Sequence, residues 1–200
     1  MGGSVLVPYV VMATTAIASF IGFDNQNFRN QYLFNISAVR NGQYYRYITS
    51  GFLHADIQHL LFNMISLYFF AQQGYMEIVG NISFLIIYFG SIIAGNMLSY
   101  LYYKNQYYYS ALGASGGVTG VIFSFIAFFP TAQLGIFFII PMSAWLFAIV
   151  YIAYSYWASK NANDNIGHTA HLGGALFGLF YTIATHYDIV FYQWNHLFMQ

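Results

Sequence analysis

Charged residues are missing from most of the length of this chain, and their absence limits what it can fold into. No Asp, Glu, Lys or Arg occurs within residues 1–23, 57–76, 78–103, 105–159 or 165–187. A helix that crosses the hydrocarbon layer of a membrane needs about 20 mostly apolar residues, because the layer is roughly 30 Å thick and each residue rises about 1.5 Å. Each charge-free stretch is therefore long enough to hold a membrane-crossing helix.

The composition excludes a soluble protein. Hydrophobic residues make up 59% of the 200 residues and charged residues only 5%, against roughly 25% charged in a typical globular chain. The net charge is zero, which argues against nucleic acid as an electrostatic partner. The absence of cysteine excludes disulfides, thiolate metal sites and a cysteine nucleophile. We therefore expect a multi-pass membrane protein whose main partner is the lipid bilayer.

Helix breakers divide the longest charge-free stretch, residues 105–159, into two. Pro130, Gly135 and Pro141 interrupt it near its middle, and proline removes a backbone donor that a helix needs. The sequence thus predicts a single all-α domain over residues 1–200 with six membrane-crossing helices. The predicted spans lie near residues 4–22, 57–76, 81–103, 115–129, 137–157 and 168–185.

The remaining segments are predicted to lie at or near the membrane surface. The first apolar stretch has no basic start and no clear cleavage site, so we interpret it as a span and not as a secretory signal. Residues 24–53 form the only long connection and contain several aromatic side chains. Aromatic residues concentrate at membrane interfaces, so this first loop is expected there. The tail after Tyr187 is short.

Three polar sites interrupt the apolar spans at what we predict to be the same depth. Asn63, Ser115 and His171 each lie 14 or 15 residues before the residue that ends the predicted helix. Spans two, four and six run in the same direction if every span crosses the membrane once. Because the helix rise is constant, the three side chains are expected at one level, and polar groups at membrane depth pair with one another or line a wet cavity. We therefore predict one shared chamber.

Small residues indicate which of these helices touch. Glycines four residues apart let two helix backbones approach closely, and two such pairs occur: Gly116 with Gly120, and Gly174 with Gly178. The first pair follows Ser115 on the fourth span and the second follows His171 on the sixth. Close packing of these two spans would bring His171 within reach of Ser115.

These residue types suit hydrolysis by a serine nucleophile. A serine hydroxyl becomes reactive when a base removes its proton, and a neutral histidine is the usual base near pH 7. The backbone N–H of Ser115 at a helix start, the amide of Asn63 and the ring of His59 are candidate donors to the oxyanion. No carboxylate is expected near Ser115 or His171, so the sequence predicts a Ser–His dyad that needs no metal and no cofactor.

With these motifs in order, the chain resembles the rhomboid family of intramembrane serine proteases over nearly its whole length. The matching segments are His54-xxxx-His59-xxx-Asn63, Gly113-Ala-Ser115-Gly116 and Ala170-His171-Leu-Gly-Gly174-xxx-Gly178. The resemblance implies a six-helix core, Ser115 as nucleophile, His171 as base, and an oxyanion hole that includes His59 and Asn63. It also implies that substrates are single-span membrane proteins, cut within or near the membrane segment.

The resemblance assigns supporting roles to further residues. His54 falls on a family histidine with a structural role, and Arg46 falls on the arginine of a first-loop Trp-Arg pair whose first residue here is Tyr45. Thr119 stands where the family often has an aromatic residue that stacks on the base. The glycines expected to support the site are Gly113, Gly116, Gly174 and Gly178.

Three other functions compete with an active protease. A catalytically inactive rhomboid-like protein would bind membrane clients, but such proteins usually lack the serine or the histidine. A small transporter would suit broken helices, although two inverted halves are not evident. A metal or haem site would have to use four histidines without an HExxH motif; they are His54, His59, His168 and His171.

Two arguments about orientation disagree. All five basic residues fall on the predicted serine-facing side: Arg29, Arg40, Arg46, Lys104 and Lys160. The positive-inside rule would place that side in the cytoplasm, whereas the rhomboid resemblance implies that it faces outward or toward a lumen. We follow the resemblance and expect a plasma (inner) membrane protein whose site opens to the outer side.

Overall fold

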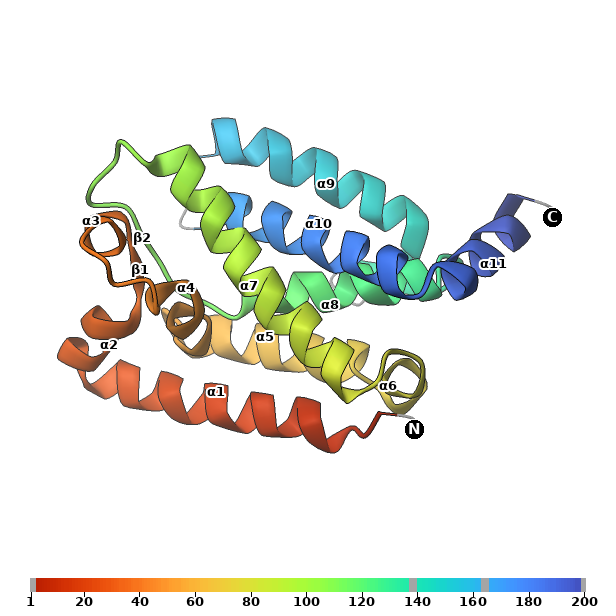
Figure 1. Ribbon diagram of the computed structural model, residues 1–200, viewed down its shortest axis with the longest axis horizontal. Helices are drawn as coiled ribbons and strands as arrows, with labels where there is room; N and C mark the ends of the chain where they lie inside the picture. Colours follow the sequence, from red (N-terminus) through yellow and green to blue (C-terminus); the bar gives the residue numbers. More distant parts are fainter. Residues whose placement is uncertain (1–2, 137–139, 163–165, 199–200) are drawn as a thin grey trace.

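The computed structural model describes residues 3–136, 140–162 and 166–198, which fold into a helical bundle (Figure 1). Two pairs of short antiparallel strands accompany the helices. In chain order the elements are α1 (Leu6–Asp24), α2 (Gln26–Tyr32), β1 (Phe34–Asn35), α3 (Ile36–Arg40), α4 (Arg46–Thr49), the 3-10 helix η1 (Ser50–Phe52), α5 (Ile57–Phe70), α6 (Gln73–Val79), α7 (Asn81–Tyr103), β2 (Ser110–Ala111), α8 (Ser115–Phe128), β3 (Gln133–Ile136), β4 (Ile140–Ser143), α9 (Ala144–Asn161), α10 (His168–Thr185) and α11 (Tyr187–Phe198).

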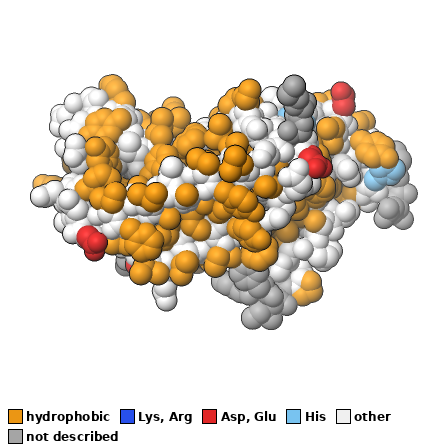
Figure 2. All heavy atoms as spheres, turned by 90° about the horizontal axis from the view of Figure 1, so that it is seen from below, with side chains coloured by type: hydrophobic (Ala, Val, Ile, Leu, Met, Phe, Trp, Pro, Cys, Tyr) orange, Lys and Arg blue, Asp and Glu red, His pale blue; other side chains and the backbone are white. Residues whose placement is uncertain are grey.

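Two of the described helices, α1 and α7, are long and apolar enough to cross a membrane by length and composition alone. Helices α5 and α8 are also apolar but shorter. The outer face of α1 carries large exposed hydrophobic side chains such as Leu6, Ile17 and Phe20. Seen from below, hydrophobic side chains form a broad band across this face of the molecule, and few acidic side chains are in view (Figure 2). Such a surface suits hydrocarbon as its solvent.

Helix α8 forms the centre of the bundle. Nearly all its residues are buried, and α10 and α7 pack most extensively on it and on each other. The largest buried side chains of the core include Tyr75, Tyr88 and Phe128. A helix that is hydrophobic on every side is stable only when other helices surround it, which explains why α8 lies inside the bundle.

The first loop is an ordered subdomain between α1 and α5, built from the short helices α2, α3, α4 and η1. Strand β1 pairs antiparallel with β2, so Phe34 lies opposite Ala111. Phe34, Ile36 and Val39 form a small core of their own. The β1–β2 pairing joins the first loop to the segment that leads into α8.

The predicted span 57–76 is wrong as a single helix. Helix α5 ends at Phe70, and α6 begins at Gln73 and runs to Val79. The break falls at Ala71 and Gln72, the two residues between the helices, and the side chain of Gln72 is exposed.

The predicted span 137–157 is wrong at its start, and residues 137–139 lie outside the described residues. Strand β3 pairs antiparallel with β4, with Gly135 opposite Pro141, and α9 begins only at Ala144. Proline is tolerated in such a two-stranded edge but not inside a helix. The short tail forms a helix of its own, α11.

The other predicted spans agree closely with the helices. Span 81–103 corresponds to α7 and span 168–185 to α10 without any shift. Span 115–129 matches α8 to within one residue, and span 4–22 is displaced by two residues relative to α1.

Candidate functional site

Ser115 and His171 meet where α8 and α10 lie side by side. Ser115 is the first residue of α8, and His171 lies one turn into α10. The Oγ atom of Ser115 and the Nε2 atom of His171 are 2.7 Å apart. Both side chains are only partly buried. This is hydrogen-bond distance for a nucleophile and a base.

The glycines of α8 and α10 make this contact possible. A Cβ atom added to Gly174 would lie 2.1 Å from the carbonyl oxygen of Gly116, and one added to Gly178 would lie 2.1 Å from that of Gly120. Any larger residue at these positions would push the two backbones apart. The small-residue spacing thus holds the helices that carry Ser115 and His171 together.

Gly113 lets the ring of His59 approach the segment before Ser115. Its φ of 139° lies in a region that residues with a side chain rarely adopt. An added Cβ would lie 2.7 Å from Cε1 of His59 and 3.6 Å from Oγ of Ser115. His59 and Ser115 therefore flank the same glycine. The N–H of Gly113 donates to the carbonyl of Ser50 at 3.0 Å, which anchors this turn to η1.

Asn63 faces the bundle interior from α5, one turn after His59. Its side chain is only 3% exposed, and its Nδ2 donates to the carbonyl of His59 at 2.9 Å. An amide nitrogen carries two hydrogens, so this bond leaves a second donor. Since α5 packs on α8, the helix that carries His59 and Asn63 lies beside the helix of Ser115.

His54 supports the residue that precedes Ser115. The backbone N–H of Ala114 donates to Nε2 of His54 at 3.3 Å, and Nδ1 of His54 lies 2.8 Å from Oγ of Ser19, which donates to the carbonyl of Phe52. This order of donors is consistent only if His54 is neutral and carries its proton on Nδ1. His54 lies in the loop before α5, and burial, with a smaller contribution from His59, lowers its pKa to about 3. It therefore stays neutral at working pH.

Arg46, in contrast, has its recorded contacts within the first loop and none with Ser115 or His171. Its guanidinium donates to the carbonyls of Asn30 and Leu33 and to the side chain of Gln43. These bonds hold α2 and α4 together, and a supporting role of Arg46 at the site stays a prediction.

Two further residues from the sequence analysis have packing partners. His168 is buried and its ring lies against Tyr154 of α9. Oγ1 of Thr119 lies 3.3 Å from the hydroxyl of Tyr151, so α9 supplies an aromatic residue next to the position where the family often has one on α8. Among the described residues, no group of three or more His, Cys, Asp or Glu side chains is placed to hold a metal ion.

Two polar residues that no sequence motif marks also support the site. Nδ2 of Asn96 on α7 donates to Oγ of Ser50 and to the carbonyl of Tyr47, both at 2.9 Å. Ser19 on α1 orients His54, as described above. The importance of Asn96 could have been predicted from the sequence, because an amide in the middle of a predicted span is costly unless it is paired.

Comparison with known proteins identifies the family. The family model of the Rhomboid domain matches residues 41–188. The chain belongs to the rhomboid family. The mitochondrial RHOMBOID-like protein 12 of Arabidopsis thaliana is 30% identical to this rhomboid protein. The match covers 76% of this chain and 50% of the plant protein. Mitochondrial rhomboid protein 1 of Saccharomyces cerevisiae is 32% identical over 67% of the chain and 40% of its own length. A candidate rhomboid protease of Bacillus subtilis, YdcA, is 33% identical over 70% of the chain and 66% of its own length.

Family membership establishes the all-α rhomboid bundle and supports an integral membrane protein. The chain spans about half the length, or less, of the plant and yeast relatives. The expected location in a plasma membrane is not supported, because both of these relatives are named as mitochondrial.

Proposed function

We propose that this rhomboid protein is an intramembrane serine endopeptidase that uses Ser115 as nucleophile and His171 as general base. The observation that carries the proposal is the 2.7 Å contact between Oγ of Ser115 and Nε2 of His171. It places a hydroxyl and an imidazole from two helices at proton-transfer distance. Hydrogen-bond donors also surround this pair: His59 and Asn63 on α5, and the backbone N–H of Ser115 at the start of α8. A serine and a histidine with only a structural role would not need such donors.

Acylation follows from this geometry. His171 removes the proton of Ser115 as Oγ attacks the carbonyl carbon of the scissile peptide bond, which gives a tetrahedral intermediate with a negative oxygen. His171 then donates the same proton to the leaving nitrogen as the C–N bond breaks. The products of this half-reaction are the amine fragment and an acyl ester on Ser115.

Deacylation repeats the sequence with water. His171 takes a proton from a water molecule that attacks the ester, and returns it to Oγ of Ser115 as the ester bond breaks. The carboxylate product leaves and the dyad is restored. Both side chains are only partly buried, which suits a step that requires access of water to a site within the bundle.

The negative oxygen needs donors that are placed before the reaction starts. Ser115 begins α8, so its N–H is among those that have no acceptor within the helix. The second hydrogen of the Asn63 amide and a ring N–H of His59 complete the proposed oxyanion hole. Asn63 is fixed by its bond to the carbonyl of His59, so its orientation costs little when charge develops.

Replacing Asn63 with alanine tests this assignment. We expect kcat to fall by roughly 10²–10³, the usual effect of losing one oxyanion donor, with KM nearly unchanged. Steady-state cleavage of a labelled membrane substrate measures both parameters. A change in KM with kcat unaltered, or no change in either parameter, would show that Asn63 is not part of the oxyanion hole.

Substrates are proposed to be single-span membrane proteins cut within or near the membrane segment. A helix in lipid keeps its carbonyls in hydrogen bonds, so the scissile bond must become extended before Ser115 can attack it. Glycine and other poor helix formers lower the cost of that local unwinding. Incubation with a single-span substrate in liposomes, followed by mass spectrometry of the fragments, tests the function. Tight retention of an uncut substrate would favour an inactive client-binding protein instead.

The site is proposed to open to the non-cytoplasmic side of its membrane. Helix α10 runs from His168 at the level of the site to Thr185 at the far end of the bundle, where α11 and the C-terminus lie (Figure 1). A reporter fused after Gln200 is therefore expected on the cytoplasmic side in a bacterial membrane. Exposure of that reporter on the outer side would reverse the orientation and leave the dyad chemistry untouched.

A further inference from the structure

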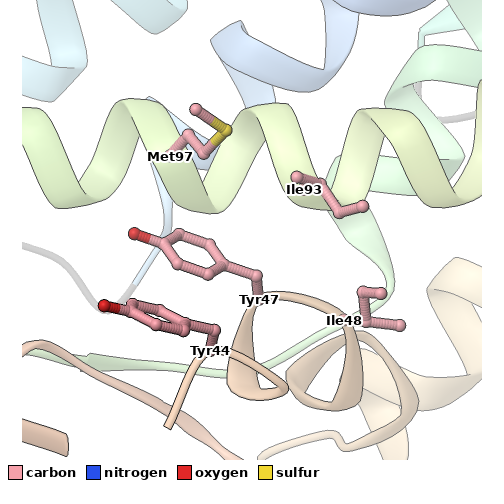
Figure 3. Close-up of a pocket in the computed structure, with 5 residues that line it drawn as sticks. All are labelled: Tyr44, Tyr47, Ile48, Ile93 and Met97. Atoms are coloured by element: carbon pink, nitrogen blue, oxygen red, sulfur yellow. The ribbon is translucent and has the colours of Figure 1, made fainter. Parts of the chain in front are cut away.

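A groove on the outer side of α7 lies apart from the dyad (Figure 3). Its volume is about 310 Å³, near the lower end for sites that hold part of a small molecule. Helix α7 supplies one wall and the first loop supplies the other; the lining residues are Tyr44, Tyr47, Ile48, Ile93 and Met97. The side chains of Tyr44, Ile48 and Met97 are exposed, so the groove is open at the surface, beside a helix that is long and apolar enough to cross a membrane.

The groove is apolar at one end and polar at the other. Ile48 and Ile93 lie at one end, while the hydroxyls of Tyr44 and Tyr47 point the same way along α7, past Met97 (Figure 3). Tyr100 follows one turn later on α7, and its ring centroid is 6.4 Å from that of Tyr47. The hydroxyls therefore point toward the end of α7 that meets the membrane interface.

A positive charge is linked to this end of the groove through Tyr100. The guanidinium of Arg40 donates to the hydroxyl of Tyr107 at 2.8 Å and lies over its ring. A hydrogen bond with Tyr100 raises the pKa of Arg40, which keeps it charged. Within the described part of the chain, the recorded partners of Arg40 are tyrosines and not carboxylates, so its charge is available to an anion. Lys104, the exposed residue that follows α7, is a further cation near this end of the helix in sequence.

We propose that the groove between α4 and α7 binds one phospholipid with an anionic headgroup. An acyl chain lies along Ile93 and Met97, and the phosphate lies against Arg40 and the tyrosine hydroxyls. Charge complementarity selects this occupant, since hydrocarbon alone would fill the apolar end but would leave the guanidinium without a counter-ion. The wall of the groove is joined to the site: the carbonyl of Tyr47 accepts from Asn96, which also holds Ser50.

Native mass spectrometry of the purified protein in detergent tests the proposal. The protein is titrated with phosphatidylglycerol and, separately, with phosphatidylcholine of the same chains. We expect phosphatidylglycerol to bind more tightly, and Arg40→Gln to weaken its binding about fivefold, which is the effect of one cation near a membrane surface, without changing the binding of phosphatidylcholine. Equal affinity for the two lipids, or an unchanged affinity in Arg40→Gln, would overturn the proposal.

Two more variants make the test specific. Lys160→Gln removes another exposed cation that lies over a tyrosine ring, that of Tyr156, but on α9, away from the groove; it should bind phosphatidylglycerol as the unaltered protein does. Met97→Trp fills the groove and should weaken the binding of both lipids. If Lys160→Gln lowers affinity as much as Arg40→Gln, binding follows net charge and the groove is not the site.

Discussion

Replacing Ser115 with alanine is expected to abolish cleavage of a membrane substrate, with kcat lowered by at least about 10³-fold. The change removes the only atom of this residue that can attack a carbonyl, together with one hydrogen bond to His171. Because the serine is only partly buried and alanine fits the start of a helix, thermal stability should stay close to that of the unaltered protein. Cleavage in liposomes and the unfolding temperature in detergent are the two measurements.

The matched variant is His171→Ala, which should lose as much activity as Ser115→Ala. Groups that act as a unit are strongly non-additive, so the double variant should be no slower than either single one. Substantial cleavage by Ser115→Ala would mean that another nucleophile does the chemistry. Losses that multiply in the double variant would mean that the two residues act independently.

Gly174→Ala is expected to lower both stability and activity by a large amount, although Gly174 carries no side chain. The added Cβ would lie 2.1 Å from the carbonyl oxygen of Gly116, so α8 and α10 must separate. Overpacking of this kind costs about 1–3 kcal/mol of stability. Displacing catalytic groups by about 1 Å lowers rates by about 10²-fold, so activity should fall further than the stability loss alone predicts.

A matched control for this prediction is Gly74→Ala in α6, where an added Cβ would meet nothing within 4 Å. The same change should leave activity intact there and raise or preserve the unfolding temperature, because alanine favours a helix over glycine by about 1 kcal/mol. Stability and activity would both be unaffected in Gly174→Ala if the close approach of the two helices were unimportant. That result would contradict the packing account.

Helix positions in the bundle were predictable where one physical signal dominated. The length of the charge-free stretches predicted the positions of α7 and α10, and the glycine pairs indicated that α8 and α10 pack together. Equal depth, calculated from helix rise alone, placed Ser115 and His171 together, and the structure puts their reactive atoms within hydrogen-bond distance. Their catalytic roles, and those of His59 and Asn63, remain proposals.

Other features depend on contacts between segments far apart in the chain, which periodicity does not report. The β3–β4 pairing and the late start of α9 reflect Pro141 and its partner strand, and not the hydrophobicity that made residues 137–157 look like one helix. The role of Ser19 could not be predicted, because it depends on the contact between α1 and His54, which lies far along the chain. The bonds of Arg46 that organise the first loop join residues 13 and 16 positions apart.

The most direct test of the central claim is labelling with a fluorescent fluorophosphonate probe, which reacts with an activated serine. Purified protein, Ser115→Ala and His171→Ala are treated in parallel in liposomes, and the labelled residue is identified by mass spectrometry. The account predicts that only the unaltered protein is labelled, on Ser115. Labelling of His171→Ala at the same rate would contradict it, because Ser115 would then react without the base that the structure places beside it.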